Sequence, residues 1–245
     1  KIVKHSEISA LDTIIEVGPG RGILTDEMMD ISKKIIAVEI DKKLAVALCE
    51  KYEGRKNITI INEDFLKYNP PLKRKLKFVA NLPYCISTAV ISKILSLSNW
   101  DTAVLMVQKE VANRLRAQPN SPDYSVLSIV CQVRCSVEKL FNVPNTCFNP
   151  VPEVTSTVVK LSRLKKPLIK KSNEKFFFNV VRSAFLHRRK TLLNSLSMEL
   201  KIDKKVLEEQ ISLAGISPLC RAETVPINGF VKLAEKVAIG RSVGG

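Results

Sequence analysis

The stretch Thr13-Ile-Ile-Glu-Val-Gly-Pro-Gly-Arg-Gly22 decides the fold. Its first half is an apolar run typical of a buried strand, and its second half has glycine at every other position. The apolar residues that follow from Ile23 predict a helix. Glycines between a strand and a helix let the backbone approach a ligand closely. The stretch therefore indicates the start of a right-handed βαβ unit.

Strands alternate with helical patterns through the first half of the chain. Apolar runs predict strands at residues 35–38, 58–61, 78–80 and 103–107, with helices between them. This alternation is typical of an α/β fold with a parallel, doubly wound, Rossmann-like sheet. Two later strands, near residues 135–137 and 155–161, complete the predicted sheet.

The pattern changes after the last predicted strand. The segment from Arg163 to Asn173 is charged and broken by Pro167, which predicts a linker. Beyond it, apolar residues recur at helical spacing, and Asp203 is placed to cap a helix that Gly215 ends. We predict two domains, a sheet domain at residues 1–164 and a small all-helical domain at residues 174–245.

Positive charge is concentrated in the second of these parts. The chain has a formal net charge of +15, and residues 163–245 hold 17 Lys and Arg against 7 Asp and Glu, a net of +10. A polyanionic partner, above all nucleic acid, is the simplest explanation. The alternative is charge that only keeps exposed helices soluble.

Composition disfavours a membrane span and a metal site. No apolar run approaches the roughly 20 residues that a span needs. The six cysteines have no zinc-site spacing, and the chain has only His5 and His187 to add to them. Cysteines that lie among apolar residues are typical of a reducing compartment, so we expect a cytoplasmic protein.

Acidic residues follow successive predicted strands. Glu39 ends the second strand, where a carboxylate can accept hydrogen bonds from both hydroxyls of a ribose, and Asp64 follows the third. Glu16 places a carboxylate in the glycine turn, which suits the amino and cationic groups of S-adenosylmethionine better than a phosphate. A dinucleotide fingerprint would also need Gly or Ala where this chain has Ile23. The pattern therefore favours S-adenosylmethionine.

Asn81-Leu-Pro-Tyr84 follows the fourth predicted strand and suits methylation of an amino group on an aromatic ring. The lone pair of such a nitrogen is delocalised, so its N–H groups need acceptors that direct the lone pair at a methyl donor. The Asn81 side-chain oxygen and the Pro83 carbonyl are candidate acceptors, and the Tyr84 ring can stack on the base. The plainer alternative is a strand-to-helix turn capped by Asn81.

Taken in order, these and later motifs closely resemble the KsgA-type small-subunit rRNA adenine N6-dimethyltransferases, over nearly the whole chain. The motifs are Glu16-Val-Gly-Pro-Gly-Arg-Gly22, Glu39-Ile-Asp41, Glu63-Asp-Phe-Leu66, Asn81-Leu-Pro-Tyr84, Gln108-Lys-Glu-Val-Ala-Asn-Arg-Leu115, Pro119-Asn-Ser-Pro-Asp-Tyr124, Phe148-Asn-Pro-Val-Pro-Glu-Val154, Ser156-Thr-Val-Val159, Arg188-Arg-Lys-Thr-Leu192 and Arg221-Ala-Glu-Thr224.

The resemblance implies a monomeric enzyme that uses S-adenosyl-L-methionine to dimethylate two adjacent adenosines in the rRNA of an immature, pre-30S-like small subunit. The target base would leave any stack to enter the pocket. The candidate adenine-site residues are Asn81, Pro83, Tyr84 and Phe148, the last as a ring stacked on the other face of the base. The candidate cofactor residues are Glu16, Gly18, Gly20, Glu39, Ile40, Asp64, Phe65 and Asn81. The candidate RNA-binding residues are Arg114, Arg188, Arg189 and Lys190.

Three other functions stay open at this point. One is a large-subunit methylase of the erythromycin-resistance type, which shares the adenine motif. Another is an amino-group methylase with an Asn-Pro-Pro-Tyr motif, although Leu82 replaces its first proline. The third is a ribosome-assembly factor that binds RNA without essential catalysis.

Overall fold

The computed structural model describes residues 1–71, 74–148 and 154–243. The chain forms two compact units, each assembled from two segments of sequence. One unit contains residues 1–112 and 136–163, and the other contains residues 113–135 and those from 164 onward. We call them the sheet unit and the helical unit.

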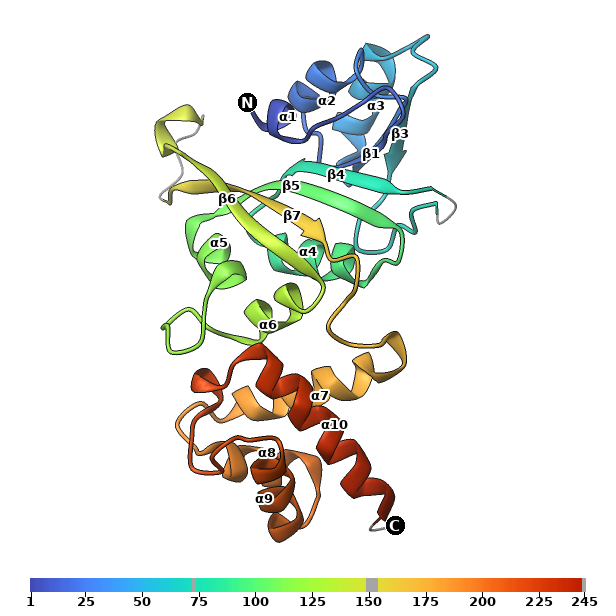
Figure 1. The fold of residues 1–245 in the computed structure, drawn as a ribbon. Coiled ribbons are helices and arrows are strands. Elements are labelled where there is room, and N and C mark those ends of the chain that lie inside the picture. The colour runs from blue at the N-terminus through green and yellow to red at the C-terminus, as the bar shows by residue number, and fades with distance from the viewer. Residues whose placement is uncertain (72–73, 149–153, 244–245) are drawn as a thin grey trace. The chain divides into compact units, whose positions relative to one another are not determined.

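The described residues of the sheet unit form a seven-stranded sheet with the order β3-β2-β1-β4-β5-β7-β6 (Figure 1). Each strand predicted from the sequence is present. The bounds are β1 (Thr13–Val17), β2 (Lys34–Glu39), β3 (Ile58–Asn62), β4 (Leu76–Asn81), β5 (Trp100–Gln108), β6 (Cys135–Val143) and β7 (Ser156–Arg163).

Strand direction confirms the parallel prediction for five strands and corrects it for the others. β1 to β5 pair in parallel, whereas β7 runs antiparallel to β5. Side-chain bonds from Ser136 to Ser162 and from Thr157 to Asn142 indicate that β6 and β7 are antiparallel as well. The apolar pattern of a buried strand reports its burial and not its direction, so the sequence did not reveal this reversal.

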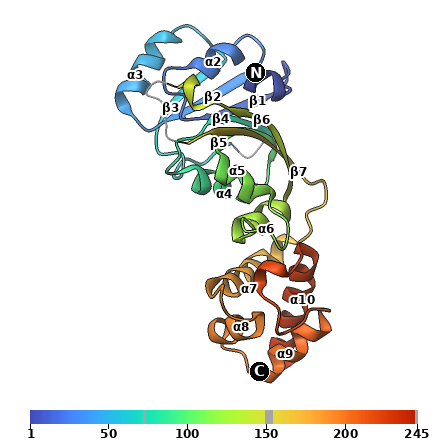
Figure 2. The same cartoon turned by 90° about the vertical axis from the view of Figure 1, so that its left-hand side faces the viewer.

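Helices cover both faces of the parallel strands, which explains why all five residues of β1 are buried. α2 (Ile23–Met28) and α3 (Lys42–Lys51) lie on one face, and α4 (Ser87–Ser96) lies on the other (Figures 1 and 2). α1 (Ile2–His5) packs beside α2. The strand order reverses between β1 and β4, and open α/β sheets bind ligands at the carboxyl ends of the strands beside such a reversal.

The helical unit confirms the helices predicted beyond residue 174, which are α7 (Glu174–Leu186), α8 (Leu192–Leu200), α9 (Lys204–Leu213) and α10 (Ile227–Val243). It also contains α6 (Val126–Gln132), which was not predicted, while α5 (Lys109–Arg116) spans the boundary at residue 112. The Asp203 side chain caps α9 by accepting from two backbone amides, and Gly215 follows that helix with φ +76°. Phe177, Leu196 and Phe230 are fully buried in the core of this unit.

Residues 113–135 pack with the helices that lie far after them in the sequence. Tyr124 is completely buried, donates a hydrogen bond to the Val225 carbonyl at 3.0 Å and meets Phe185 edge-on. The Asn120 backbone amide donates to the Glu223 carbonyl at 2.9 Å. The compact units therefore differ from the predicted ranges by this segment, and the division of function between the two parts stays a prediction.

Among the described residues, no helix is both long and apolar enough to cross a membrane, and no group of His, Cys, Asp and Glu side chains is arranged to hold a metal ion.

Candidate active site

The glycine turn after β1 needs all three of its glycines. Gly18, Gly20 and Gly22 have φ of +65°, +59° and +81°, which L side chains rarely adopt. A Cβ at Gly22 would also overlap the Tyr52 hydroxyl, which donates to the Gly22 carbonyl. At Gly20, by contrast, an added Cβ would meet nothing within 4 Å. The turn is therefore closed at Gly22 by its own structure and open at Gly20, where a ligand can approach.

Glu39 joins this turn to the end of β2. Its side chain is 5% exposed, and its two carboxylate oxygens accept hydrogen bonds from the backbone amides of Gly20 and Asp41, each at 3.0 Å. A carboxylate has about four lone-pair positions, so two remain for a ligand. The Asn62 side chain donates to the Glu39 carbonyl at 2.9 Å, so the end of β3 is hydrogen-bonded to the end of β2.

Glu16 is the most deeply buried acid of the site, at 1% exposed. The Thr25 hydroxyl donates to it at 2.6 Å. Burial raises the pKa of the Glu16 carboxyl to about 7, and the negative charges of Asp26 and Glu39 add to this effect, while the bond from Thr25 opposes it. A cationic ligand group beside Glu16 would favour the ionised carboxylate.

The raised pKa of Glu16 predicts a specific dependence of stability on pH. Between its ordinary value of 4.5 and about 7, the folded chain binds more protons than the unfolded chain at this group. The contribution of Glu16 to the free energy of unfolding should therefore fall by roughly 3 kcal/mol as pH rises through that window. Urea unfolding at pH 5 and pH 8 should show this loss in the wild type and not in Glu16→Gln. The exposed Glu27→Gln is the control, and parallel wild-type and Glu16→Gln curves would contradict the assignment.

Asp64 and Phe65 follow β3. Asp64 is half-buried, and its side chain accepts from the Leu66 amide at 2.8 Å, which fixes the carboxylate in a tight turn. Phe65 is 4% exposed and packs edge-on against Phe78 in the core, with Lys93 above its ring. The cofactor contacts predicted for Asp64 and Phe65 stay predictions.

Ile40 has the opposite environment to Phe65. It follows the buried Glu39 directly, and its side chain is 68% exposed. An exposed aliphatic side chain next to a buried carboxylate can pack on a flat ring whose sugar bonds to the acid. The structure therefore makes Ile40 available for the cofactor contact that the sequence predicts.

The Asn81 turn lies beside the glycine turn. Asn81 is the last residue of β4, is exposed, and makes no side-chain hydrogen bond within the part of the chain that the structure describes. Leu82 is buried and anchors the turn, and its amide donates to the Met106 carbonyl at 3.1 Å. A Cβ built on Gly18 would lie 3.8 Å from Pro83 Cδ. The turn that carries Asn81 thus lies close to the glycine turn at Pro83, and among the described residues the Asn81 side-chain amide is free to bind a ligand.

The other two members of the turn are fixed by bonds. The Pro83 carbonyl accepts from the Ile86 amide at 3.2 Å and keeps a second lone pair. The Tyr84 hydroxyl and the hydroxyl of the buried Ser156 are 2.7 Å apart, which fixes the ring. Ser156 belongs to β7, and no local signal in the sequence relates it to Tyr84.

Phe148 is half-buried and packs against the apolar cluster of Val104, Met106 and Val158. Residues 149–153, which follow Phe148 directly, lie outside the described residues. Its role as a second stacking ring stays a prediction.

The four predicted RNA-binding residues all belong to the helical unit and are exposed. Arg188, Arg189 and Lys190 lie between α7 and α8, and Arg188 forms an ion pair with Glu223 at 3.3 Å. Arg114 belongs to the helical unit through residues 113–135, which the sequence prediction had assigned to the sheet domain.

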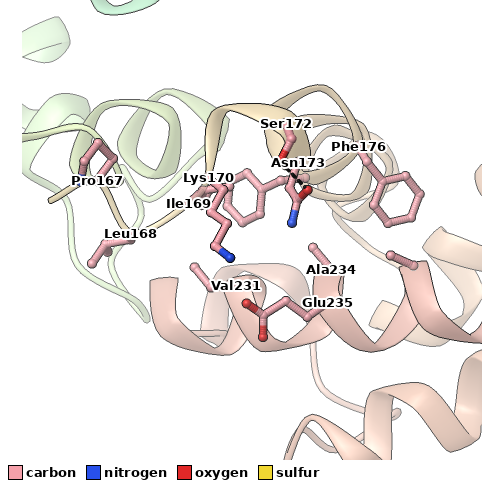
Figure 3. Close-up of a pocket in the computed structure, with 12 residues that line it drawn as sticks. Pro167, Leu168, Ile169, Lys170, Ser172, Asn173, Phe176, Val231, Ala234 and Glu235 are labelled. Carbon is pink, nitrogen blue, oxygen red and sulfur yellow. Dashed lines mark hydrogen bonds between the residues drawn. The ribbon is translucent and has the colours of Figure 1, made fainter.

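A separate cavity of about 440 Å³ lies in the helical unit, between residues 167–177 and α10 (Figure 3). Its walls are mostly apolar, and Lys170 and Glu235 extend into it from opposite sides. It shares no residue with the predicted site.

The sheet and the side chains at its strand ends define the class of the molecule. A seven-stranded sheet with helices on both faces and a glycine turn after β1 is the fold of the Rossmann-like methyltransferases. Residues 1–238 match the family model described as ribosomal RNA adenine dimethylase, and the chain belongs to this family.

The names of individual similar proteins are consistent with membership of this family. The chain is 43% identical over 239 residues to ribosomal RNA small subunit methyltransferase A of Clostridium botulinum (strain Loch Maree / Type A3), covering 96% of this chain and 86% of that protein. It is 40% identical to the protein of the same name from Clostridium acetobutylicum, over 96% and 87%. Among solved structures, a dimethyladenosine transferase from Plasmodium falciparum is similar with a TM-score of 0.81 and 28% identity, over 98% and 94% of the two chains. The 23S rRNA methyltransferase ErmE is similar with a TM-score of 0.73 and 28% identity, over 97% and 95%.

Proposed function

We propose that this enzyme transfers methyl groups from S-adenosyl-L-methionine to N6 of two adjacent adenosines in small-subunit rRNA, as a cytoplasmic monomer that acts on an immature small subunit. The observation that carries the proposal is the free Asn81 amide, held on a rigid turn beside the open glycine turn. Family membership and the relatives named for the small subunit support the choice of rRNA substrate.

The residues at the strand ends fit S-adenosylmethionine, which supplies an activated methyl group on a sulfonium when bound. Gly20 leaves open space over the turn, and the free lone pairs of the Glu39 carboxylate suit ribose hydroxyls. Asp64 offers an acceptor for an amino group of the purine, and the exposed Ile40 offers an apolar surface for its ring.

The Asn81 turn would hold the acceptor base. The Asn81 side-chain oxygen and the free lone pair of the Pro83 carbonyl accept the two N6 hydrogens, which turns the nitrogen lone pair out of conjugation. The Tyr84 ring, fixed through Ser156, stacks on the base. Asn81 and Pro83 thus stabilise charge that develops on N6 in the transition state. No general base is needed, because the methylated nitrogen can lose its proton to water afterwards.

The deciding experiment measures methyl transfer from labelled S-adenosylmethionine to purified immature small subunits and, in parallel, to large subunits. We expect dimethyladenosine in small-subunit rRNA alone. Transfer to large subunits would favour the alternative that the similarity to ErmE keeps open. Binding to small subunits without transfer would favour an assembly factor.

The open side of the glycine turn gives a matched pair of variants. Gly20 and Gly54 both have positive φ (+59° and +79°), and at both an added Cβ meets nothing within 4 Å. Gly20→Ala and Gly54→Ala should therefore each lower stability by about 1 kcal/mol. Only Gly20→Ala should weaken S-adenosylmethionine binding, since its methyl group enters the ligand space. Calorimetry on both variants tests this, and equal cofactor affinity in the two would place the ligand elsewhere.

The exposed basic run of the helical unit should govern RNA docking. Replacing Arg188, Arg189 and Lys190 with Gln should weaken small-subunit binding. The slope of the logarithm of the binding constant against the logarithm of the salt concentration should become shallower, by up to about 0.9 for each phosphate that the run no longer neutralises. Cofactor affinity should not change. Replacing the exposed Lys204, Lys205 and Lys232 with Gln removes the same charge elsewhere in the unit and is the control. A constant salt slope with only a lower melting temperature would show that the run stabilises the fold and does not dock RNA.

A further inference from the structure

A second cavity of the helical unit, of about 520 Å³, is lined mostly by polar residues and lies where three separate segments meet. The segments are the loop before α6, the turn between α7 and α8, and the 3₁₀ turn Ala222–Thr224. Its size is within the range of small-ligand sites. Its lining residues are Asn120, Ser121, Pro122, Arg188, Glu223 and Thr224.

Two of the segments that line this cavity are fixed to each other by hydrogen bonds and by a buried ring. Tyr124 is fully buried and bonds to the Val225 carbonyl, and the Asn120 amide bonds to the Glu223 carbonyl. Asn120 has φ +69°, a conformation that asparagine tolerates better than most residues. The loop and the 3₁₀ turn are thus fixed to each other, so the cavity is built into the fold.

The cavity is lined by a positively charged side chain, a negatively charged side chain and neutral polar side chains. Arg188 Nη2 donates to Glu223 Oε2 at 3.3 Å, and Arg188 Nη1 and Nε and Glu223 Oε1 form no bond within the described residues. The Asn120 side-chain amide is also without a partner in that part of the chain. The Thr224 hydroxyl donates to the Arg221 carbonyl and also lies in hydrogen-bonding contact with the Cys220 thiol.

This set of groups selects among anionic ligands. A bare phosphate would be attracted by Arg188 but repelled by the Glu223 carboxylate beside it. A ligand that fits both must carry a negative charge together with N–H or O–H donors. An unpaired ribonucleotide does so, because its phosphate is anionic and its 2′-hydroxyl and base edge donate. The ring of Pro122 and the guanidinium plane of Arg188 offer surfaces for the base.

We propose that this cavity binds one unpaired ribonucleotide of the substrate rRNA, with its phosphate on Arg188 and its donor groups on Glu223 and Asn120. The proposal rests on the rRNA methyltransferase function above and adds residues of the loop before α6 and of the 3₁₀ turn to the RNA-binding surface. It makes Glu223, an acid, a positive contributor to the binding of a polyanion.

Glu223→Gln gives a test whose two outcomes have opposite signs. The variant removes a negative charge, so general electrostatics predicts tighter RNA binding. If the carboxylate accepts from a ribonucleotide, binding to immature small subunits should instead weaken by about tenfold, which corresponds to one hydrogen bond to a charged group. The preference for a short single-stranded RNA over DNA of the same sequence should fall as well.

Two further variants locate the effect. Arg188→Gln and Arg189→Gln remove the same charge from neighbouring exposed positions, but only Arg188 lines the cavity. We expect the RNA-over-DNA preference to fall in Arg188→Gln and to stay at the wild-type level in Arg189→Gln. Melting curves of all three variants check that folding is intact.

Unchanged or tighter small-subunit binding by Glu223→Gln would overturn the proposal, and so would equal effects of Arg188→Gln and Arg189→Gln. If Glu223→Gln lowers the melting temperature and leaves the affinity for small subunits unchanged, the Arg188–Glu223 ion pair only stabilises the fold and the proposal is wrong. Methyl transfer by the wild type is measured in the same preparations. If the wild type methylates small subunits while Glu223→Gln binds them normally, only the cavity proposal fails, whereas absence of transfer by the wild type would count against the enzyme function itself.

Discussion

Asn81→Ala should lower the rate of adenine methylation by at least tenfold and leave the fold intact. The Asn81 side chain is exposed and makes no hydrogen bond within the described residues, so its removal breaks no hydrogen bond of the folded chain there. In the transition state it would accept a hydrogen bond from N6, and the loss of one such bond typically costs about 3 kcal/mol or more. The defect should therefore appear mainly in the chemical step, with a smaller loss of cofactor affinity from the cofactor contact that is also predicted for Asn81.

Single-turnover transfer to saturating small subunits measures this step directly. Asn179→Ala is the control, because it makes the same chemical change at an exposed position of α7, in the unit that holds none of the predicted adenine-site residues. The products should also be resolved into monomethyladenosine and dimethyladenosine, since a loosely held secondary amine would accumulate as the monomethyl form. Near-normal dimethylation by Asn81→Ala would remove this residue from the catalytic site.

Glu39→Gln should weaken S-adenosylmethionine binding by roughly tenfold to a hundredfold, the range expected for hydrogen bonds to a charged acceptor. Affinity for small subunits should be nearly unchanged. The substitution keeps the size of the side chain, but its new N–H group would face the amide of Gly20 or Asp41, each of which now donates to a carboxylate oxygen. Some loss of stability is therefore expected as well.

A cofactor analogue separates the two roles of Glu39. If the carboxylate binds ribose hydroxyls, an S-adenosylmethionine analogue without them should bind wild type and Glu39→Gln with similar affinity. If Glu39 only braces the glycine turn, the variant should weaken binding of both molecules by the same factor. Unchanged affinity for S-adenosylmethionine itself would exclude Glu39 from the site.

The parts of the fold that the sequence predicts are those specified by local patterns. Each apolar run that predicted a strand forms one. Because a buried strand ends where its apolar run ends, the polar residues Glu39, Asp64 and Asn81 lie at or just after strand ends. The glycine turn itself was predicted from its sequence, whereas the positive φ of Gly18 and Gly22 is a finding of the structure.

The parts that were not predicted depend on contacts between distant residues. Tyr84 and Ser156 are bonded across 72 positions, and Tyr124 and Val225 across 101. Nothing in the local pattern of either partner indicates the other. The antiparallel direction of β7 and the polar cavity at Arg188 arise in the same way, from packing that local propensity does not encode.

The split composition of the helical unit has a consequence for how the protein is made. Tyr124 leaves the ribosome well before Phe185 and Phe230, the aromatic rings of the core it joins. At synthesis rates of about 5–20 residues per second, roughly 5 to 20 seconds pass between the synthesis of Tyr124 and that of Phe230. During that interval the nascent chain can complete the sheet but holds an apolar segment with no core to enter. The apolar side chains of this segment therefore stay uncovered until the later helices of the unit have been made.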